Sequence, residues 1–169
     1  MKKVIIVLFF LTIILINNND SEEFIIPEDA IRFRIIANSN TFEDQATKVE
    51  IKNNVEKILK NDLLLINNKE EAKKILNDSI PKIKNMINNY NIDYNINYGN
   101  NYFPEKKYKG VTYKEGNYES LVVTIGSGKG DNWWCLMFPP LCLMDIENES
   151  NANSVDYKFF VKDIFDKYM

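Results

Sequence analysis

The chain has 169 residues, 45% of them hydrophobic, which is enough for one domain with a sizeable core. Its net charge of −3 gives no electrostatic reason to expect nucleic-acid binding, which requires a concentrated basic face. It contains no histidine, which excludes triads and metal sites built on imidazole. We therefore expect no cofactor and no metal, and nothing in the sequence indicates a small-molecule substrate.

The N-terminus resembles an export or anchoring signal. Lys2 and Lys3 precede an apolar run over residues 4–16, which would span about 20 Å as a helix. That is shorter than the ~30 Å hydrocarbon core of a bilayer, and it is typical of the apolar part of a signal peptide. No small-residue cleavage site follows, so an uncleaved membrane anchor stays open. We divide the chain into a signal-like or anchor segment with a polar tether, residues 1–23, and a single exported domain, residues 24–169.

The exported domain is predicted to begin with a strand. Residues 31–37 start with strict alternation and end as an apolar run, which indicates a central strand with Arg32 and Arg34 on its less buried side. Thr41, with Asp44 three residues later, resembles a capping box. The pattern therefore predicts a helix start at that point.

Two amphipathic helices are predicted next. The first has an apolar stripe with the spacing of one buried face: Ile51, Val55, Ile58 and Leu59. Asn68 and Glu71 form a second cap, and the stripe of the second helix is Ala72, Ile75, Leu76, Ile80, Ile83, Ile87 and Tyr90. Pro81 interrupts that stripe without changing its phase, which predicts a kinked helix or two abutting helices.

The second half of the domain is predicted to be mostly strands. Residues 92–98 alternate and predict a half-buried strand ended by Gly99. Residues 107–113 and 118–125 are expected to form a hairpin around a turn at residues 115–117.

A last helix is predicted from an aromatic stripe, which usually marks core packing, although a membrane-lying or partner helix is the alternative. Its members are Tyr157, Phe160, Val161, Ile164, Phe165 and Tyr168. The order of elements predicts an α+β fold of two layers, with a mostly antiparallel sheet and the helices packed on one face.

Both tryptophans and both cysteines lie within residues 132–142. A strand that runs into a corner at Pro139 and Pro140 would bring Cys135 and Cys142 face to face. In an oxidising compartment such a pair favours a disulfide, and two buried thiols are the alternative. The spacing does not match the C-x-x-C of a redox dithiol.

The neighbouring Trp133 and Trp134 point to opposite faces of such a strand, so one ring can be core while the other is left for a partner. The exposed ring, together with Phe138, is the best candidate for an interface anchor, because aromatic residues on a rigid turn often have that role. The glycine-rich residues 126–131 lack the residue order of a phosphate-binding loop. We interpret them as a loop that positions the Trp-Cys segment.

Catalysis has no positive support in the sequence, and we predict that the chain is not an enzyme. The carboxylates that could serve in hydrolysis are Asp44, Asp93, Glu119, Asp131 and Asp145. No spacing in the sequence pairs any two of them, and most such charges lie on solvated faces.

Several stretches together resemble one protein family. They are residues 31–39 with Asp44-Gln45, Tyr102-Phe103-Pro104, Gly116-x-Tyr118-Glu119, Gly126-x-Gly128-x-Gly130-x-Asn132, and all of residues 132–142. They cover nearly all of the exported domain and resemble the stage II sporulation protein R family. The resemblance implies a protein made in the forespore and exported to the intermembrane space. There it would trigger a membrane-embedded aspartic protease of the mother cell, which processes the precursor of sigma-E.

The resemblance thus implies a ligand whose partner performs the chemistry. It does not assign the activating surface, so the candidate contacts are our own inference. The candidate partner-binding residues are Trp133, Trp134, Phe138, Asn132, Arg32 and Asn38. A generic extracytoplasmic module that binds the cell envelope is the alternative, and it predicts affinity for wall material without dependence on a protease.

Overall fold

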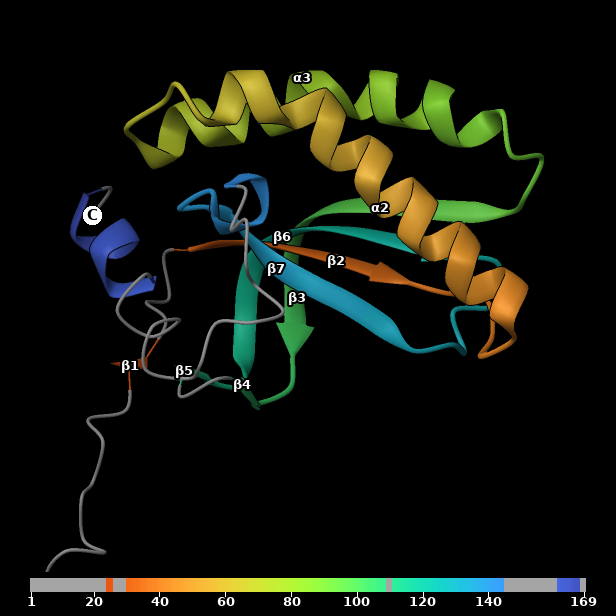
Figure 1. Cartoon of the computed structure of the whole chain (residues 1–169). Helices are drawn as coiled ribbons and strands as arrows, with labels where there is room; N and C mark the ends of the chain where they lie inside the picture. Colours follow the sequence, from red (N-terminus) through yellow and green to blue (C-terminus); the bar gives the residue numbers. More distant parts are fainter. Residues whose placement is uncertain (1–23, 26–29, 109–110, 145–160, 168–169) are drawn as a thin grey trace, which may run out of the picture.

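The computed structural model describes residues 24–25, 30–108, 111–144 and 161–167 (Figure 1). Residues 1–23, which carry the predicted signal or anchor, lie outside these ranges, as do Tyr157, Phe160 and Tyr168 of the aromatic stripe. In the part of the chain that is described, no helix combines the length and apolar character needed to cross a bilayer.

The larger sheet has four strands in the order β3-β6-β2-β7. Their bounds are β2 Ile31–Ile36, β3 Tyr94–Phe103, β6 Gly116–Ile125 and β7 Asn132–Phe138. β2 pairs with β6 in parallel, and the β2–β7 and β3–β6 pairs are antiparallel. The predicted central strand is therefore confirmed, and β7 lies at one end of the sheet.

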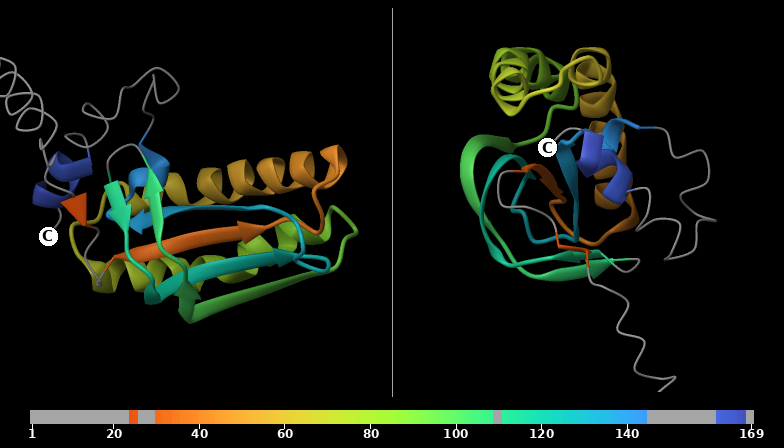
Figure 2. Two further views of the ribbon diagram at one scale, coloured as in Figure 1. Left: turned by 90° about the horizontal axis from the view of Figure 1, so that it is seen from below. Right: turned by 90° about the vertical axis from the view of Figure 1, so that its left-hand side faces the viewer.

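Two long helices cover one face of this sheet, so the predicted α+β fold of two layers is confirmed (Figure 2). α2 spans Phe42–Leu63 and α3 spans Lys69–Asn88. The predicted caps hold, since the Thr41 and Asn68 side chains each accept a hydrogen bond from a backbone N–H in the first turn. α3 continues through Pro81 as one helix.

The core lies between the helices and this face of the sheet. Ile51, Val55 and Leu59 of α2 are fully buried, as are Phe33 and Ile35 of β2. Burying side chains of this size contributes roughly 1.5–3 kcal/mol each before the cost in chain entropy. The helical residues 161–167 add further buried side chains to the same core, as the stripe predicted: Val161, Ile164 and Phe165.

The predicted hairpin is wrong, because its two halves belong to different sheets. β4 Lys106–Tyr108 and β5 Val111–Tyr113 pair with each other, and β1 Phe24–Ile25 completes this small sheet in the order β1-β5-β4. β6 pairs instead with β3 along its whole length, from Gly116 opposite Phe103 to Ile125 opposite Tyr94. Turn residues show where a chain reverses, but they do not select the strand with which it pairs.

Gly99 does not end β3, contrary to the prediction. It pairs with Ser120 in the middle of the ladder, and the strand continues to Phe103. A glycine can occupy a strand interior at a modest cost in entropy. Here that cost is offset by a ladder of ten residue pairs, which extends β3 to Phe103, where the Phe103 ring packs against Trp134 of β7.

Candidate partner-binding site

β7 carries the Trp-Cys segment as an edge strand. It runs antiparallel to β2, with Trp133 opposite Ile35 and Trp134 opposite Arg34. Beyond Phe138 the chain turns through Pro139 and Pro140 into the short 3-10 helix η1 Leu141–Leu143. The predicted strand and corner are therefore confirmed.

The corner brings the two cysteines together. The structure joins Cys135 and Cys142 as a disulfide, with Cα atoms 5.7 Å apart, a separation typical of such bonds. The bond ties η1 to β7 and closes a small ring around the buried Met137 and Phe138. Phe138 is only 2% exposed, so its predicted place in an exposed aromatic anchor is wrong and it packs in the core.

Trp133 faces the helices. Its ring meets Phe33 edge to face, with centroids 5.8 Å apart, and Lys52 Nζ of α2 lies 4.7 Å from its centroid. The ammonium over the ring face gives a cation–π contact worth about 0.5–1 kcal/mol at a partly exposed site.

Trp134 points to the opposite face, as the alternation of a strand requires. Its ring lies 5.5 Å from the rings of Phe103 and Tyr113, and Lys106 Nζ of β4 lies 5.2 Å from its centroid. Both tryptophans are half-buried. The expected division into one core ring and one free ring is therefore replaced by two rings that are each partly exposed and partly packed against the protein.

Arg32 is fully buried, which corrects the prediction that it lies on the less buried side of its strand. Its Cζ lies 3.4 Å from the centroid of Tyr118, and the rings of Phe103, Trp134 and Tyr113 lie between 5.1 and 5.9 Å away. Burial lowers the pKa of the guanidinium to about 10, so the charge persists at neutral pH. With no exposed surface, Arg32 supports the Trp134 side of the sheet and does not itself offer a contact.

Arg34, two residues further along the same face, is half-buried. Burial also lowers the pKa of its guanidinium. The buried Nε of Arg34 has no hydrogen-bond partner among the described residues, and the same holds for Nε and Nη1 of Arg32. Arg34 therefore brings an under-satisfied cation to the edge of the site, and sequence reasoning did not include it.

Asn38 connects the turn after β2 to the loop before β7 and to the start of α2. Its Oδ1 accepts from the Ser127 backbone N–H at 2.9 Å, and its Nδ2 donates to Asp44 at 3.0 Å. Close by, Asn40 Oδ1 accepts from the Asp131 N–H at 2.6 Å. The turn after β2 thus holds the loop before β7, and Asn38 positions that loop.

The glycines of that loop allow a close approach of the two backbones. A Cβ at Gly130 would overlap the Ser39 carbonyl, and one at Gly126 would overlap the Asn38 side chain. Lys48 of α2 donates to Asp131 O at 3.1 Å from the other side. Several stretches that carried the family resemblance therefore meet in one junction that fixes the start of β7.

The described carboxylates each serve a local structural contact or face solvent. Asp44 accepts from Ser39 and Asn38 at the start of α2, and these hydrogen bonds lower the pKa of its carboxyl. Glu119 accepts from Tyr98 at 2.9 Å and pairs with Lys73 at 3.4 Å. None of the four described candidates bonds to another, and Asp145 lies outside the described residues. Within the described ranges no group of three or more potential metal ligands is found.

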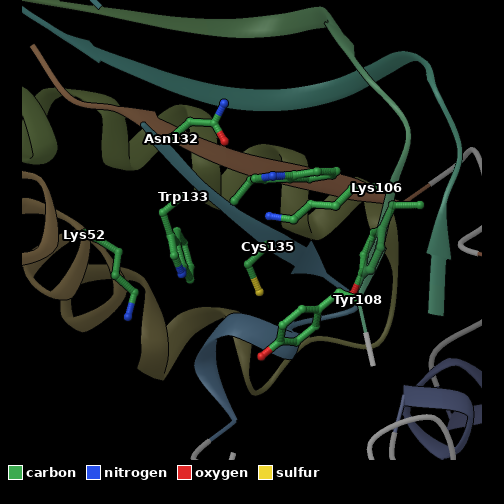
Figure 3. A pocket seen from close by; sticks show the side chains of 8 residues that line it. Lys52, Lys106, Tyr108, Asn132, Trp133 and Cys135 are labelled. Atoms are coloured by element: carbon green, nitrogen blue, oxygen red, sulfur yellow. The ribbon is translucent and has the colours of Figure 1, made fainter. Parts of the chain in front are cut away.

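A hollow of about 270 Å³ opens beside β7 (Figure 3). The figure shows Lys52 beside Trp133 at one end, Tyr108 at the other, and Cys135 between them. The described residues that line it are Lys52, Lys106, Tyr108, Tyr113, Asn132, Trp133, Trp134 and Cys135. We call this hollow the β7 groove. Asn132, exposed at its rim, and the two tryptophans are the predicted residues that the structure brings together there.

The groove also contains residues that sequence reasoning missed. Lys52 comes from the middle of α2, while Lys106 and Tyr108 come from β4. A smaller hollow of about 170 Å³ shares Lys106, Asn132 and Trp134 with the groove and adds Arg34. No local pattern links these positions, because β4 reaches the site only through the small sheet.

The fold and the groove define an α+β domain whose edge strand presents an aromatic and cationic surface, a class of protein suited to binding. Within that class, the chain belongs to the stage II sporulation protein R family, whose model matches residues 27–148. Residues of this chain are 36% identical over 130 positions to "Stage II sporulation protein R" of Bacillus subtilis (strain 168). That match covers 73% of this chain and 58% of the relative, so the chain spans less than two thirds of the relative's length. No solved structure matches the chain.

Proposed function

We propose that this chain is an exported signalling ligand of sporulation. It binds and activates a membrane-embedded aspartic protease, which then processes the precursor of sigma-E in the mother cell. The β7 groove carries the proposal, because it presents two half-buried tryptophans on a strand held by a disulfide and by the loop junction. Membership of a sporulation family supports the biological setting.

The groove suits recognition of another protein. Tryptophan is enriched among residues that dominate binding energy, and a rigid support reduces the entropy lost on association. Trp133 and Trp134 are both supported from behind by aromatic rings of the protein. They can therefore contact a partner without large rearrangement.

Export to the space between forespore and mother cell is part of the proposal. The disulfide between Cys135 and Cys142 supports it, because such bonds persist in extracytoplasmic compartments and are rare in the cytosol. The apolar residues 4–16 would direct export or hold the chain at the membrane. In this position the chain would reach the extracytoplasmic side of the protease.

The proposal is tested by co-expressing the full chain, the candidate protease and the sigma-E precursor in a non-sporulating host. Precursor cleavage is followed by immunoblot. We expect cleavage to require the chain and to fall at least about tenfold with Trp134→Ala, as for an interface anchor. Leu65→Ala is the matched control, since Leu65 is 82% exposed and lies beyond the end of α2.

Cleavage that proceeds equally well without the chain would overturn the proposal. If the chain instead binds purified cell-wall material and cleavage does not respond to it, the envelope-binding alternative takes its place. Each variant is first compared with the parent by urea unfolding, so that loss of activity is not confused with loss of the fold.

A further inference from the structure

The β7 groove follows the edge of a strand. Its lining includes four consecutive residues of β7, from Asn132 to Cys135. Successive side chains of a strand point to opposite faces of the sheet, so a hollow over one face would be lined by alternate residues. A hollow lined by all four lies along the strand edge, where both faces and the backbone between them are accessible.

The backbone of that edge is available for pairing. The Ala37 N–H donates to Asp131 O at 3.5 Å, one position beyond the last pair of the β2–β7 ladder, Ile36 opposite Asn132, so the backbone groups of the two strands face each other at this position. Because hydrogen-bonded and non-bonded pairs alternate in antiparallel strands, Asn132 and Trp134 direct their backbone N–H and C=O away from β2. Among the described strands, none pairs with that side of β7.

The charged side chains around this edge are mostly positive, whereas the chain as a whole is negatively charged. The chain has a net charge of −3, whereas Lys106 and Arg34 both face the smaller hollow beside Trp134, against one carboxylate, Glu105. Lys52, on the Trp133 side, already pairs with Glu56 at 3.1 Å. The cations available to a ligand are therefore those on the Trp134 side, where the buried Arg34 Nε has no hydrogen-bond partner within the described ranges.

We propose that the β7 groove binds an extended acidic segment of the partner protein, which adds as a fifth strand to the sheet beside β7. Its backbone pairs with Asn132 and Trp134. A carboxylate on the Trp134 face meets Lys106 and Arg34, and an apolar side chain on the other face packs against Trp133. Strand addition obtains affinity from backbone hydrogen bonds and specificity from alternate side chains. The inference rests on the proposed function only in taking the protease as the partner that supplies this segment.

The backbone contact is tested with Asn132→Pro, compared with Asn132→Ala. Proline removes an N–H that the β2–β7 ladder does not use, and edge strands tolerate it at such positions. Alanine removes the same side chain and keeps the N–H. Binding of the full chain to the protease in nanodiscs is measured by biolayer interferometry. We expect Asn132→Pro to weaken binding at least about tenfold and Asn132→Ala less than about threefold.

The charge contact is tested with Lys106→Glu, and Lys82→Glu on the exposed side of α3 is the control of equal charge change. Lys106→Glu should weaken binding about five- to tenfold and Lys82→Glu less than twofold. A photo-crosslinking amino acid at Asn132 should link to an acidic extracytoplasmic segment of the protease.

The outcomes separate the two proposals. A parent chain that does not bind the protease would overturn the proposed function and this inference with it. A parent chain that binds, with Asn132→Pro equal to Asn132→Ala, would overturn strand addition alone. Equal loss with Lys106→Glu and Lys82→Glu, or a crosslink to a segment without carboxylates, would overturn the acidic character of the ligand.

Discussion

The disulfide between Cys135 and Cys142 should stabilise the domain by a predictable amount. The bond closes a ring of about eight residues, and the chain-entropy relation gives about 2.5 kcal/mol for a ring of that size at 25 °C. Both cysteines are half-buried, so replacing the pair by alanine removes little apolar burial. The double change Cys135→Ala with Cys142→Ala should therefore lower the free energy of unfolding by about 2–3 kcal/mol.

Urea unfolding followed by tryptophan fluorescence measures this change, because both tryptophans lie on the strand that the disulfide holds. With an m value of about 1–3 kcal/mol/M, the midpoint should fall by roughly 1–2.5 M. The parent chain reduced with dithiothreitol should match the double variant. A reduced parent whose midpoint equals that of the oxidised chain would refute the reasoning, because the ring would then contribute nothing.

Three further changes test other parts of the structure by the same unfolding assay. Hydrogen bonds lower the pKa of Asp44 in the folded chain, so the contribution of this carboxylate to folding stability is present above the unfolded pKa and is lost as the pH falls through the folded pKa. The Asp44→Asn variant should therefore lose less stability than the parent between pH 7 and pH 2.5. Gly130→Ala should cost more than about 2 kcal/mol, because its Cβ would overlap the Ser39 carbonyl. Glu119→Gln, which removes the ion pair with Lys73, should lower the midpoint at low salt and less so at 1 M salt. An Asp44→Asn variant that loses as much stability in acid as the parent would contradict the Asp44 hydrogen bonds. A Glu119→Gln midpoint that differs from the parent by the same amount at low and high salt would contradict the ion pair, and a Gly130→Ala midpoint equal to that of the parent would contradict the close approach at Ser39.

The elements that local patterns specify were predicted well. Thr41 and Asn68 marked the helix starts because a cap is a contact within one turn. The Trp-Cys segment was predicted as a strand and corner because alternation and proline act locally. The pairing of β6 with β3 is not evident from the sequence, since Gly116 and Asn117 have the residue types of a turn but lie in β6 and pair with β3.

The candidate site could be predicted only in part. The two tryptophans were found from residue type and spacing, but Lys52 and Lys106 reach them from α2 and β4, which no spacing in the chain reveals. The sequence predicts Arg32 on the less buried side, whereas the residue is fully buried, because alternation does not tell which face a second sheet will cover. Residues 31–39 carry part of the family resemblance, and the contacts of Asn38 show a role in holding the loop before β7.

We propose that the chain acts as a ligand from the extracytoplasmic side of the protease. The most direct test reconstitutes the oriented protease in vesicles, with the sigma-E precursor facing its cytoplasmic side, and adds the purified full chain to one side at a time. We predict cleavage when the chain is on the extracytoplasmic side, with Trp134→Ala reducing it and Leu65→Ala leaving it unchanged. Cleavage that does not depend on the chain, or that requires the chain on the precursor's side, would contradict the account.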